Sequence, residues 1–243
     1  MSRSTVSRET IVQRVILVAT GTSVGKTHTA LSLVQAIALS GASVAGLKPI
    51  ESGVVPGASS DYSLLAGVST FHVKPPPYAL AEPVSPHLAA RRAGVRITVN
   101  VVRRWVNAHR GTCVIETAGG LLSPLGDGLT NLDLLAALLP AHVILVAPDR
   151  LGVLHDVSAC QLALWSTITP DALVVLQPPE LPDASSGTNA AELRSLALAS
   201  PVVQYPRADP TSPATLAAAT NLFQLLRTTA PSNLRHEPHS KPR

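Results

Sequence analysis

The sequence predicts a single α/β domain whose mostly parallel sheet is covered by helices on both faces, in the doubly wound arrangement. Short runs of Val, Ile and Leu alternate with helical patterns along the chain, which is typical of right-handed strand–helix–strand crossovers. Hydrophobic residues make up 46% of the chain and charged residues 14%, and this composition favours strands that are buried on both faces. A small turn that ends in Gly-Lys-Thr joins the first strand to the first helix, as in phosphate-binding loops.

Strands are expected where the apolar runs are short and rich in β-branched residues. These runs lie at about 14–19, 43–48, 112–117, 142–147, 172–176 and 201–204. Because ligands bind at the carboxyl ends of the strands in such sheets, we expect functional residues to follow directly after these runs.

Helices are expected where apolar residues recur every three or four positions. These patterns lie at about 26–40, 60–67, 86–93, 98–109, 131–139, 153–168, 188–199 and 213–228. Gly41 is a good C-terminal cap for the first helix, and Ser85 followed by Pro86 opens the third. Thr98 is expected to cap the fourth helix. The Pro- and Ser-rich stretch 178–187 is expected to be a loop inside the domain.

The domain is expected to span residues 14–228, between flexible tails at 1–13 and 229–243 that carry much of the basic excess. The net charge of +4 comes without a stripe of basic residues interleaved with aromatics, so nucleic-acid binding is not expected. No apolar run approaches the roughly 18 residues that span a membrane, and the N-terminus lacks the apolar centre of a secretion signal. Cys113 and Cys160 suit ordinary core thiols, so we expect a cytoplasmic location with no membrane partner.

The phosphate-binding turn is the most informative segment of the chain. It reads Ala-Thr-Gly-Thr-Ser-Val-Gly-Lys-Thr over residues 19–27 and follows the apolar run Val-Ile-Leu-Val. Backbone N–H groups of such a turn, together with the N-terminus of the following helix, point at anionic oxygens. Lys26 can then reach the outer phosphates of a nucleotide, and the hydroxyl of Thr27 can hold Mg2+. The usual pattern has a glycine six residues before the lysine, where this chain has Thr20.

Three charged residues are expected at the same edge of the sheet as this turn. Lys48 ends the second strand, where its charge could neutralise a phosphoryl group or simply reach out to solvent. Glu116 ends the third strand, where it could hold Mg2+ or pair with a lysine. Asp61 could be a third ligand or an ordinary charge at a helix N-terminus. His87 could act as a base, but a structural hydrogen-bonded histidine is the simpler interpretation.

Together these segments resemble the dethiobiotin synthetase family. The family's motifs occur here in order: the phosphate turn, Lys-Pro-x-x-Ser-Gly at 48–53, Ser-Asp at 60–61, Ala-Glu-Pro-x-Ser-Pro-His at 81–87 and Glu-x-Ala-Gly-Gly at 116–120. The resemblance is dense over residues 14–156 and thinner afterwards. It implies a homodimeric enzyme of the P-loop nucleotide-binding fold, which uses CO2 or bicarbonate, ATP and Mg2+ to close a ureido ring on 7,8-diaminononanoate during biotin synthesis.

The resemblance also implies roles for individual residues. Lys26 and Lys48 would be catalytic and would stabilise phosphoryl charge. The Mg2+ ligands would be Thr27, Asp61 and Glu116. The nucleotide would contact Ser23, Val24, Gly25, Lys26, Thr27, His28, Asp61, Glu116, Thr117, Ala118, Gly119, Gln177 and Pro206. The diamine and its carbamate would contact Thr22, Ser23, Ser52, Leu151, Gly152 and His155, the last three across the dimer interface.

Four residues depart from the family pattern. Ala19 replaces the first glycine of the turn, so it must keep a negative φ or accept strain. Thr117 replaces a glycine and is expected to crowd the nucleotide, and His155 stands where an asparagine is common. Pro178, which follows Gln177, has neither an N–H nor a carboxylate with which to read adenine. We therefore expect loose selectivity among nucleoside triphosphates.

Two alternative functions remain open from the sequence. A switch ATPase that partitions or positions macromolecules has the same fold, but it usually carries a second lysine near the start of the turn. None lies between Arg14 and Lys26. A catalytically impaired relative would retain the fold alone. The retained lysines and carboxylates argue against it, because unpaired buried charges are costly to keep.

Overall fold

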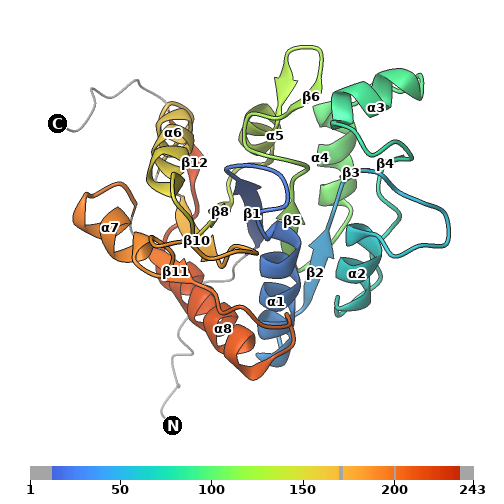
Figure 1. Cartoon of the computed structure of the whole chain (residues 1–243). Helices are drawn as coiled ribbons and strands as arrows, with labels where there is room; N and C mark the ends of the chain where they lie inside the picture. Colours follow the sequence, from blue (N-terminus) through green and yellow to red (C-terminus); the bar gives the residue numbers. More distant parts are fainter. Residues whose placement is uncertain (1–12, 170–171, 200, 236–243) are drawn as a thin grey trace, which may run out of the picture.

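The centre of the protein is a six-stranded parallel sheet with the strand order β11-β10-β8-β1-β5-β2 (Figure 1). The structure is a computed structural model, and it describes residues 13–169, 172–199 and 201–235. The strands of this sheet are β1 (Arg14–Ala19), β2 (Val44–Leu47), β5 (Thr112–Glu116), β8 (His142–Pro148), β10 (Leu173–Gln177) and β11 (Val202–Gln204). The predicted doubly wound α/β fold is confirmed, and each of these six strands lies where an apolar run predicted it.

Helices cover both faces of this sheet, and alternation along β1 shows how the two faces divide. Val15 and Leu17 pack with α1 and α8, whereas Ile16 and Val18 pack on the opposite face with α4, α5 and α6. Because side chains alternate along a strand, one apolar run supplies both cores. The helices are α1 (Lys26–Leu39), α2 (Asp61–Gly67), α3 (Pro86–Arg92), α4 (Val99–Asn107), α5 (Asn131–Leu138), α6 (Val153–Trp165), α7 (Asn189–Ser195) and α8 (Pro213–Thr228).

Three short strand pairs lie outside the central sheet and were not predicted. They are β3 (Ile50–Ser52) with β4 (Tyr78–Leu80), β6 (Pro124–Gly126) with β7 (Leu129–Thr130), and β9 (Ile168–Thr169) with β12 (Asn233–Leu234). Strands of two or three residues are too short to show alternation, so the sequence carries no signal for them. The β3–β4 pair matters most for function, because it brings the segment after Lys48 against the segment that contains Glu82.

The C-terminal boundary of the domain lies later than the sequence indicated. Ser232, expected in the flexible tail, exchanges main-chain hydrogen bonds with Ala141, at 3.1 and 2.8 Å. The main-chain nitrogen of Arg235 donates to the Thr167 carbonyl at 2.9 Å. These contacts are main-chain pairings that composition does not encode. The expected tail segments 1–12 and 236–243 lie outside the described residues. Within the described part of the chain, no helix has the length and apolarity needed to span a bilayer.

Gly46 in β2 is a close-packing position that should tolerate no side chain. A Cβ atom there would lie 2.9 Å from Leu65 Cδ2 and 3.2 Å from Val34 Cγ2, at the junction of β2 with α1 and α2. We expect Gly46→Ala to lower the free energy of unfolding by about 1–3 kcal/mol, because overpacking forces neighbours to shift. Gly67→Ala is the matched control, since nothing lies within 4 Å of its Cβ position. Urea denaturation of both variants checks this, and equal stability of the Gly46 variant and the wild type would contradict it.

Candidate active site

The phosphate turn connects β1 to α1 at the carboxyl edge of the sheet, as predicted (Figure 1). Two residues in it have positive φ angles, Ser23 at 56° and Gly25 at 93°. Ala19 keeps the negative φ of a strand residue and ends β1, so the replacement of the first glycine costs no strain there. In this turn, the non-glycine residue with a left-handed backbone conformation is Ser23 and not Ala19.

Gly25 is required for two independent reasons. Its φ angle of 93° lies in the region that favours glycine. In addition, a Cβ atom at this position would lie 2.5 Å from Cγ of Gln177 and 3.0 Å from its Cβ. The end of β10 therefore packs directly against the backbone of the phosphate turn.

The two polar residues that follow Gly25 point in different directions. The ammonium group of Lys26 donates to the Gly21 carbonyl at 3.2 Å, so this side chain lies over the turn. Burial, with the like charge of Lys48, lowers the pKa of Lys26 to about 8. The hydroxyl of Thr27 instead donates to Oε1 of Glu116 at 3.0 Å. The start of α1 is thereby tied to the end of β5.

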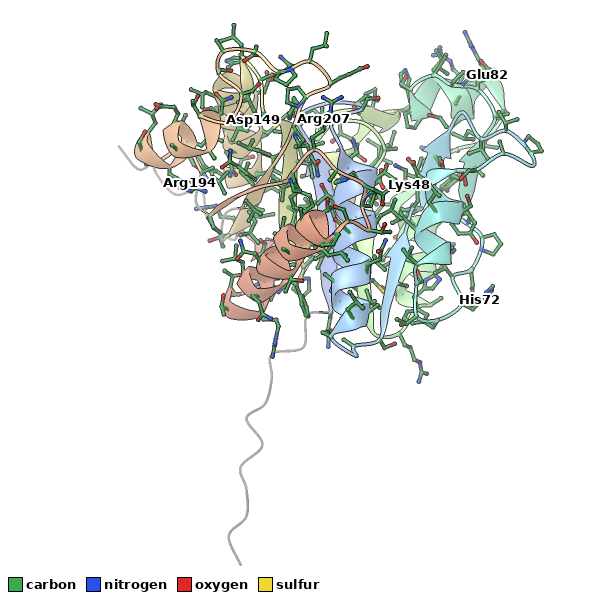
Figure 2. The ribbon with its side chains drawn as sticks, turned by 60° about the horizontal axis from the view of Figure 1, so that its bottom comes forward. Lys48, His72, Glu82, Asp149, Arg194 and Arg207 are labelled. Carbon is green, nitrogen blue, oxygen red and sulfur yellow. The ribbon has the colours of Figure 1, made fainter. Side chains whose placement is uncertain are left out.

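Lys48, Glu116 and Asp61 form a compact charged cluster beside the turn. Nζ of Lys48 lies 2.5 Å from Glu116 Oε1 and 3.1 Å from Asp61 Oδ2. Figure 2 shows Lys48 in the interior beside α1, and its side chain is 6% exposed. Of the two alternatives for Lys48, the structure excludes a solvated strand end.

The pKa shifts in this cluster follow from burial and from its charges. Burial alone would lower the pKa of Lys48, but the carboxylates of Glu116 and Asp61 reverse this and hold it above its ordinary value. Burial raises the pKa of the Glu116 carboxyl, and Asp61 adds to the rise, although Lys48 opposes it. Lys48 therefore stays an ammonium ion at neutral pH, with its charge fixed next to the phosphate turn.

Glu51 positions Asp61, and sequence reasoning missed it. The two carboxylate oxygens of Glu51 accept hydrogen bonds from the main-chain N–H groups of Asp61, at 2.7 Å, and Tyr62, at 3.1 Å. Ser60 and Ser63 complete a capping box at the same helix end. A carboxylate at the N-terminus of α2 satisfies free N–H groups and fixes where Asp61 begins the helix. Glu51 lies inside the Lys-Pro-x-x-Ser-Gly motif, and this position is the sequence feature from which its role could have been predicted.

The segment after Glu116 is fastened to the phosphate turn. The hydroxyl of Thr117 donates to the Leu17 carbonyl at 2.9 Å, and this buried residue is 1% exposed. This hydrogen bond turns the hydroxyl of Thr117 toward β1, whereas the crowding of a nucleotide by Thr117 stays a prediction. Further along, the main-chain nitrogen of Leu121 donates to the Ala19 carbonyl at 2.7 Å.

Asn131, at the start of α5, is a second residue that the sequence did not single out. Its amide nitrogen donates to the carbonyls of Ala118, at 2.6 Å, and Gly120, at 2.7 Å. Asn131 is fully buried. These two hydrogen bonds set the conformation of the glycine-containing loop after Glu116, which faces the phosphate turn. No sequence motif marks Asn131, because it meets this loop only in the folded structure.

The predicted substrate residues fall into two groups in the chain. Thr22 and Ser23 lie in the phosphate turn, and Ser52 lies in β3 just beyond Lys48. Leu151 and His155 are exposed and flank the start of α6, beyond β8. Because two strands separate β8 from β2 in the sheet, the second group stands apart from the Lys48 cluster within one chain.

His87 has the environment of a hydrogen-bonded structural histidine. Its Nδ1 atom lies 2.9 Å from the hydroxyl of Ser85, in the first turn of α3. Ser85 therefore occupies the predicted cap position, but its hydroxyl bonds the histidine and not a helix N–H. Thr98 likewise stands at the cap position of α4 without a side-chain hydrogen bond to the helix.

A pocket of about 290 Å3 lies beside the phosphate turn. Its lining includes Ser23, Val24, Gly25, His28, Gln177 and Pro206, all predicted nucleotide contacts, together with Pro148, Pro178, Pro179, Glu180, Arg207 and Ala208. The amide nitrogen of Gln177 donates to the Thr29 hydroxyl at 2.7 Å, and Nε2 of His28 lies 2.8 Å from the Ala208 carbonyl. Gln177 thus braces α1 as well as lining the pocket.

Comparisons with known proteins identify related chains. Residues 13–182 match the family model described as an AAA domain. The ATP-dependent dethiobiotin synthetase of Nitrosospira multiformis is 38% identical over 158 residues, which cover 60% of this chain and 70% of that protein. That of Anaeromyxobacter dehalogenans strain 2CP-1 is 38% identical over 197 residues, 77% of this chain and 86% of that protein. Among solved structures, the hydrogenase maturation factor HypB of Archaeoglobus fulgidus is 11% identical, with a TM-score of 0.45 over 90% of this chain and 92% of that one.

The buried amide of Asn131 should be essential for the stability of this edge. In Asn131→Asp, a carboxylate would face the two carbonyls that now accept hydrogen bonds. We expect the free energy of unfolding to fall by about 2–4 kcal/mol, because buried polar groups without partners are costly. Asn100→Asp, at an exposed position on α4, is the control and should change stability by less than about 0.5 kcal/mol. Equal effects of the two substitutions in urea denaturation would remove Asn131 from this role.

Proposed function

Since the chain belongs to the family of ATP-dependent dethiobiotin synthetases, we propose that it closes the ureido ring of dethiobiotin on 7,8-diaminononanoate. One observation carries the proposal beyond family membership. The buried ammonium group of Lys48 lies between two carboxylates, directly beside a phosphate-binding turn that carries Lys26 and Thr27. Such a site is built to hold and neutralise several anions at once, which is what a phosphoryl transfer to a carbamate requires.

The proposed reaction has three steps. One amine of the substrate captures CO2 and loses a proton, which gives a carbamate. A carbamate oxygen attacks the γ-phosphorus of ATP, ADP leaves, and a carbamic–phosphoric anhydride forms. The second amine then attacks the carbamoyl carbon and displaces inorganic phosphate, which closes the ring. The protein mainly aligns the reacting groups and neutralises charge, since the nucleophiles come from the substrate.

We assign the charge stabilisation to Lys26 and Lys48. Lys26 belongs to the phosphate turn and would contact the outer phosphates of the nucleotide. Lys48 would reach the transferring phosphoryl group from the end of β2. The two carboxylates beside Lys48 keep it protonated, so its charge is available where negative charge develops on the transferring group. Low exposure strengthens this effect, because little water screens the charge.

The oxygen donors around Lys48 fit a magnesium ion. Glu116 Oε2 is buried and has no hydrogen-bond partner among the described residues, so one of its two oxygens is free to bind a cation. Thr27, Asp61 and Glu116 would hold Mg2+, with water and phosphate oxygens completing the coordination. When bound, the ion would neutralise charge on the phosphate oxygens. Hard oxygen ligands in small number are typical of Mg2+ sites that are shared with a nucleotide.

The carbamate end of the substrate would contact Thr22, Ser23 and Ser52, close to the Lys48 cluster. We propose that Leu151, Gly152 and His155 reach the far end of the substrate from a second protomer of a homodimer. Leu151 is 75% exposed, which favours a partner surface there. The free N–H groups at the start of α6 suit the substrate carboxylate.

The alternative of a switch ATPase is less well supported. Its second lysine is absent from the turn, and the named relatives are synthetases. The alternative of an impaired relative is countered by the intact cluster, in which every charged member has a partner of opposite charge. The retained ion pairs support a working site.

The decisive experiment measures phosphate release from MgATP and bicarbonate, with and without 7,8-diaminononanoate, together with mass detection of dethiobiotin. Release that requires the diamine and yields dethiobiotin supports the proposal. Hydrolysis that ignores the diamine and gives no product would favour the switch ATPase. No release with any nucleoside triphosphate would favour the impaired relative.

Removing the charge of Lys48 should abolish ring closure. We expect Lys48→Met to lower the rate of dethiobiotin formation by a factor of about 100 or more, since the variant lacks a buried charge at the reacting group. Lys74→Met, at an exposed lysine outside the site, is the control and should retain full activity. Thermal denaturation establishes that both variants fold. Near-normal turnover of a folded Lys48 variant would exclude it from the mechanism.

Glu116 should determine the response to magnesium. We expect Glu116→Gln to need about ten times more Mg2+ for half-maximal turnover, because an amide oxygen binds a hard cation less well than a carboxylate. The same shift should appear in the Mg2+ concentration that supports binding of a non-hydrolysable ATP analogue. Glu192→Gln, on the exposed surface of α7, serves as the control. An unchanged magnesium titration would rule out the ligand role.

A further inference from the structure

The nucleoside pocket is walled by two loops that are distant in sequence. One wall is Gln177–Glu180, formed by the last residue of β10 and the three residues after it, and the other is Pro206–Ala208, which follows β11. The phosphate turn and His28 close the third side. Because the two loops meet only in space, the width of the pocket depends on what holds them together.

The walls offer few main-chain donors to a base. Pro178, Pro179 and Pro206 have no N–H group. The main-chain N–H of Ala208 donates to the Pro206 carbonyl at 3.1 Å. The side-chain amide nitrogen of Gln177 is also occupied, because it donates to the Thr29 hydroxyl. Main-chain recognition of a base edge depends on N–H groups beside carbonyls. Few such N–H groups are available in these two walls.

Arg207 is the side chain that bridges the two walls. Its Nη1 atom donates to the Pro179 carbonyl at 2.5 Å and also to the Glu180 carbonyl. Within residues 13–169, 172–199 and 201–235, Arg207 forms no ion pair with a carboxylate. A guanidinium group carries five N–H donors, so Nε and Nη2 keep donors beyond these two contacts.

The chain that continues from the first loop is anchored independently, at residues 186–189, by Asp149. The buried carboxylate of Asp149 accepts from the main-chain nitrogen of Gly187, at 2.9 Å, and from the amide of Asn189, at 2.7 Å. The hydroxyl of Ser186 donates to the Asp149 carbonyl at 2.7 Å. The segment beyond the first loop is thus fixed to Asp149, which directly follows β8, and Arg207 holds the loop itself across the pocket.

We propose that Arg207 is the specificity-determining residue of this pocket: it clamps the two walls around the nucleoside and offers its remaining donors to the base. An arginine supplies donors only, and every common base carries ring nitrogens or carbonyl oxygens that accept. A pocket that is read through Arg207 therefore binds nucleoside triphosphates with different bases. This inference rests on the proposed function, in which a nucleoside triphosphate is the phosphoryl donor.

The test compares binding of probes that do and do not contain a nucleoside. Non-hydrolysable analogues of ATP, CTP and GTP fill both the turn and the pocket, whereas inorganic tripolyphosphate fills the turn alone. We expect the wild type to bind the three analogues with similar affinity. Arg207→Ala should bind each analogue about tenfold more weakly, the scale of a lost charge-assisted hydrogen bond, and should bind tripolyphosphate as well as the wild type does.

Two further variants separate the clamp from general effects. Arg207→Lys keeps the charge but lacks the fork, so it should recover only part of the affinity for the analogues. Arg194→Ala is the matched control, because Arg194 on α7 also donates to a main-chain carbonyl, that of Val202 at 2.7 Å, outside the pocket. It should bind all four probes as the wild type does.

Several results would overturn the inference. These are wild-type affinity of Arg207→Ala for the analogues, an equal loss with tripolyphosphate, or a strong wild-type preference for one base. Full recovery in Arg207→Lys would show that charge alone matters and would overturn the clamp. A wild-type protein that binds the analogues but forms no dethiobiotin would contradict the proposed reaction and leave the role of Arg207 intact.

Discussion

The burial of the Glu116 carboxylate is the constraint on which the active-site edge depends. Its residue is 1% exposed, and an isolated charge in such a place would cost several kcal/mol. Lys48 and Thr27 meet this requirement from two other elements, and Asp61 joins through Lys48. The ends of β2 and β5 and the starts of α1 and α2 must therefore converge. The contacts that satisfy this buried charge are also the ones that the proposed reaction would use.

The central architecture could be predicted because burial on both faces leaves a strong signal in the sequence. Each of the six strands of the main sheet is built around a short apolar run, with its polar residues mostly at the strand ends, and the helices between them show the helical period. Helix ends were less certain. The sixth helix was expected to continue to residue 168 but ends at Trp165, and the last turn gives way to the short strand β9. Local pairing of this kind depends on the C-terminal segment, which lies far away in sequence.

The residues of the candidate site that lie in sequence motifs were predictable, and the others were not. Lys26, Lys48, Asp61 and Glu116 stand at strand ends or helix starts, where chemistry is expected, and the structure brings the last three into direct contact. Asn131 and Arg207 could not be found in this way, since their roles are hydrogen bonds to carbonyls of distant loops. Main-chain carbonyls have no sequence signature. The hydrogen bond of the Thr117 hydroxyl to the Leu17 carbonyl in the neighbouring strand could not be predicted for the same reason.

The contact between Gly25 and Gln177 limits how this protein can change over evolution. The side chain of Gln177 touches the backbone of the phosphate turn, and its amide holds Thr29 in α1. A larger residue at position 177 would displace the turn that binds the phosphates of any nucleotide. A smaller one would lose the hydrogen bond to Thr29 in α1. Base preference is therefore free to drift through the loops 178–180 and 206–208, while position 177 stays fixed. A designer who wishes to introduce a preference for one base should begin with those loops.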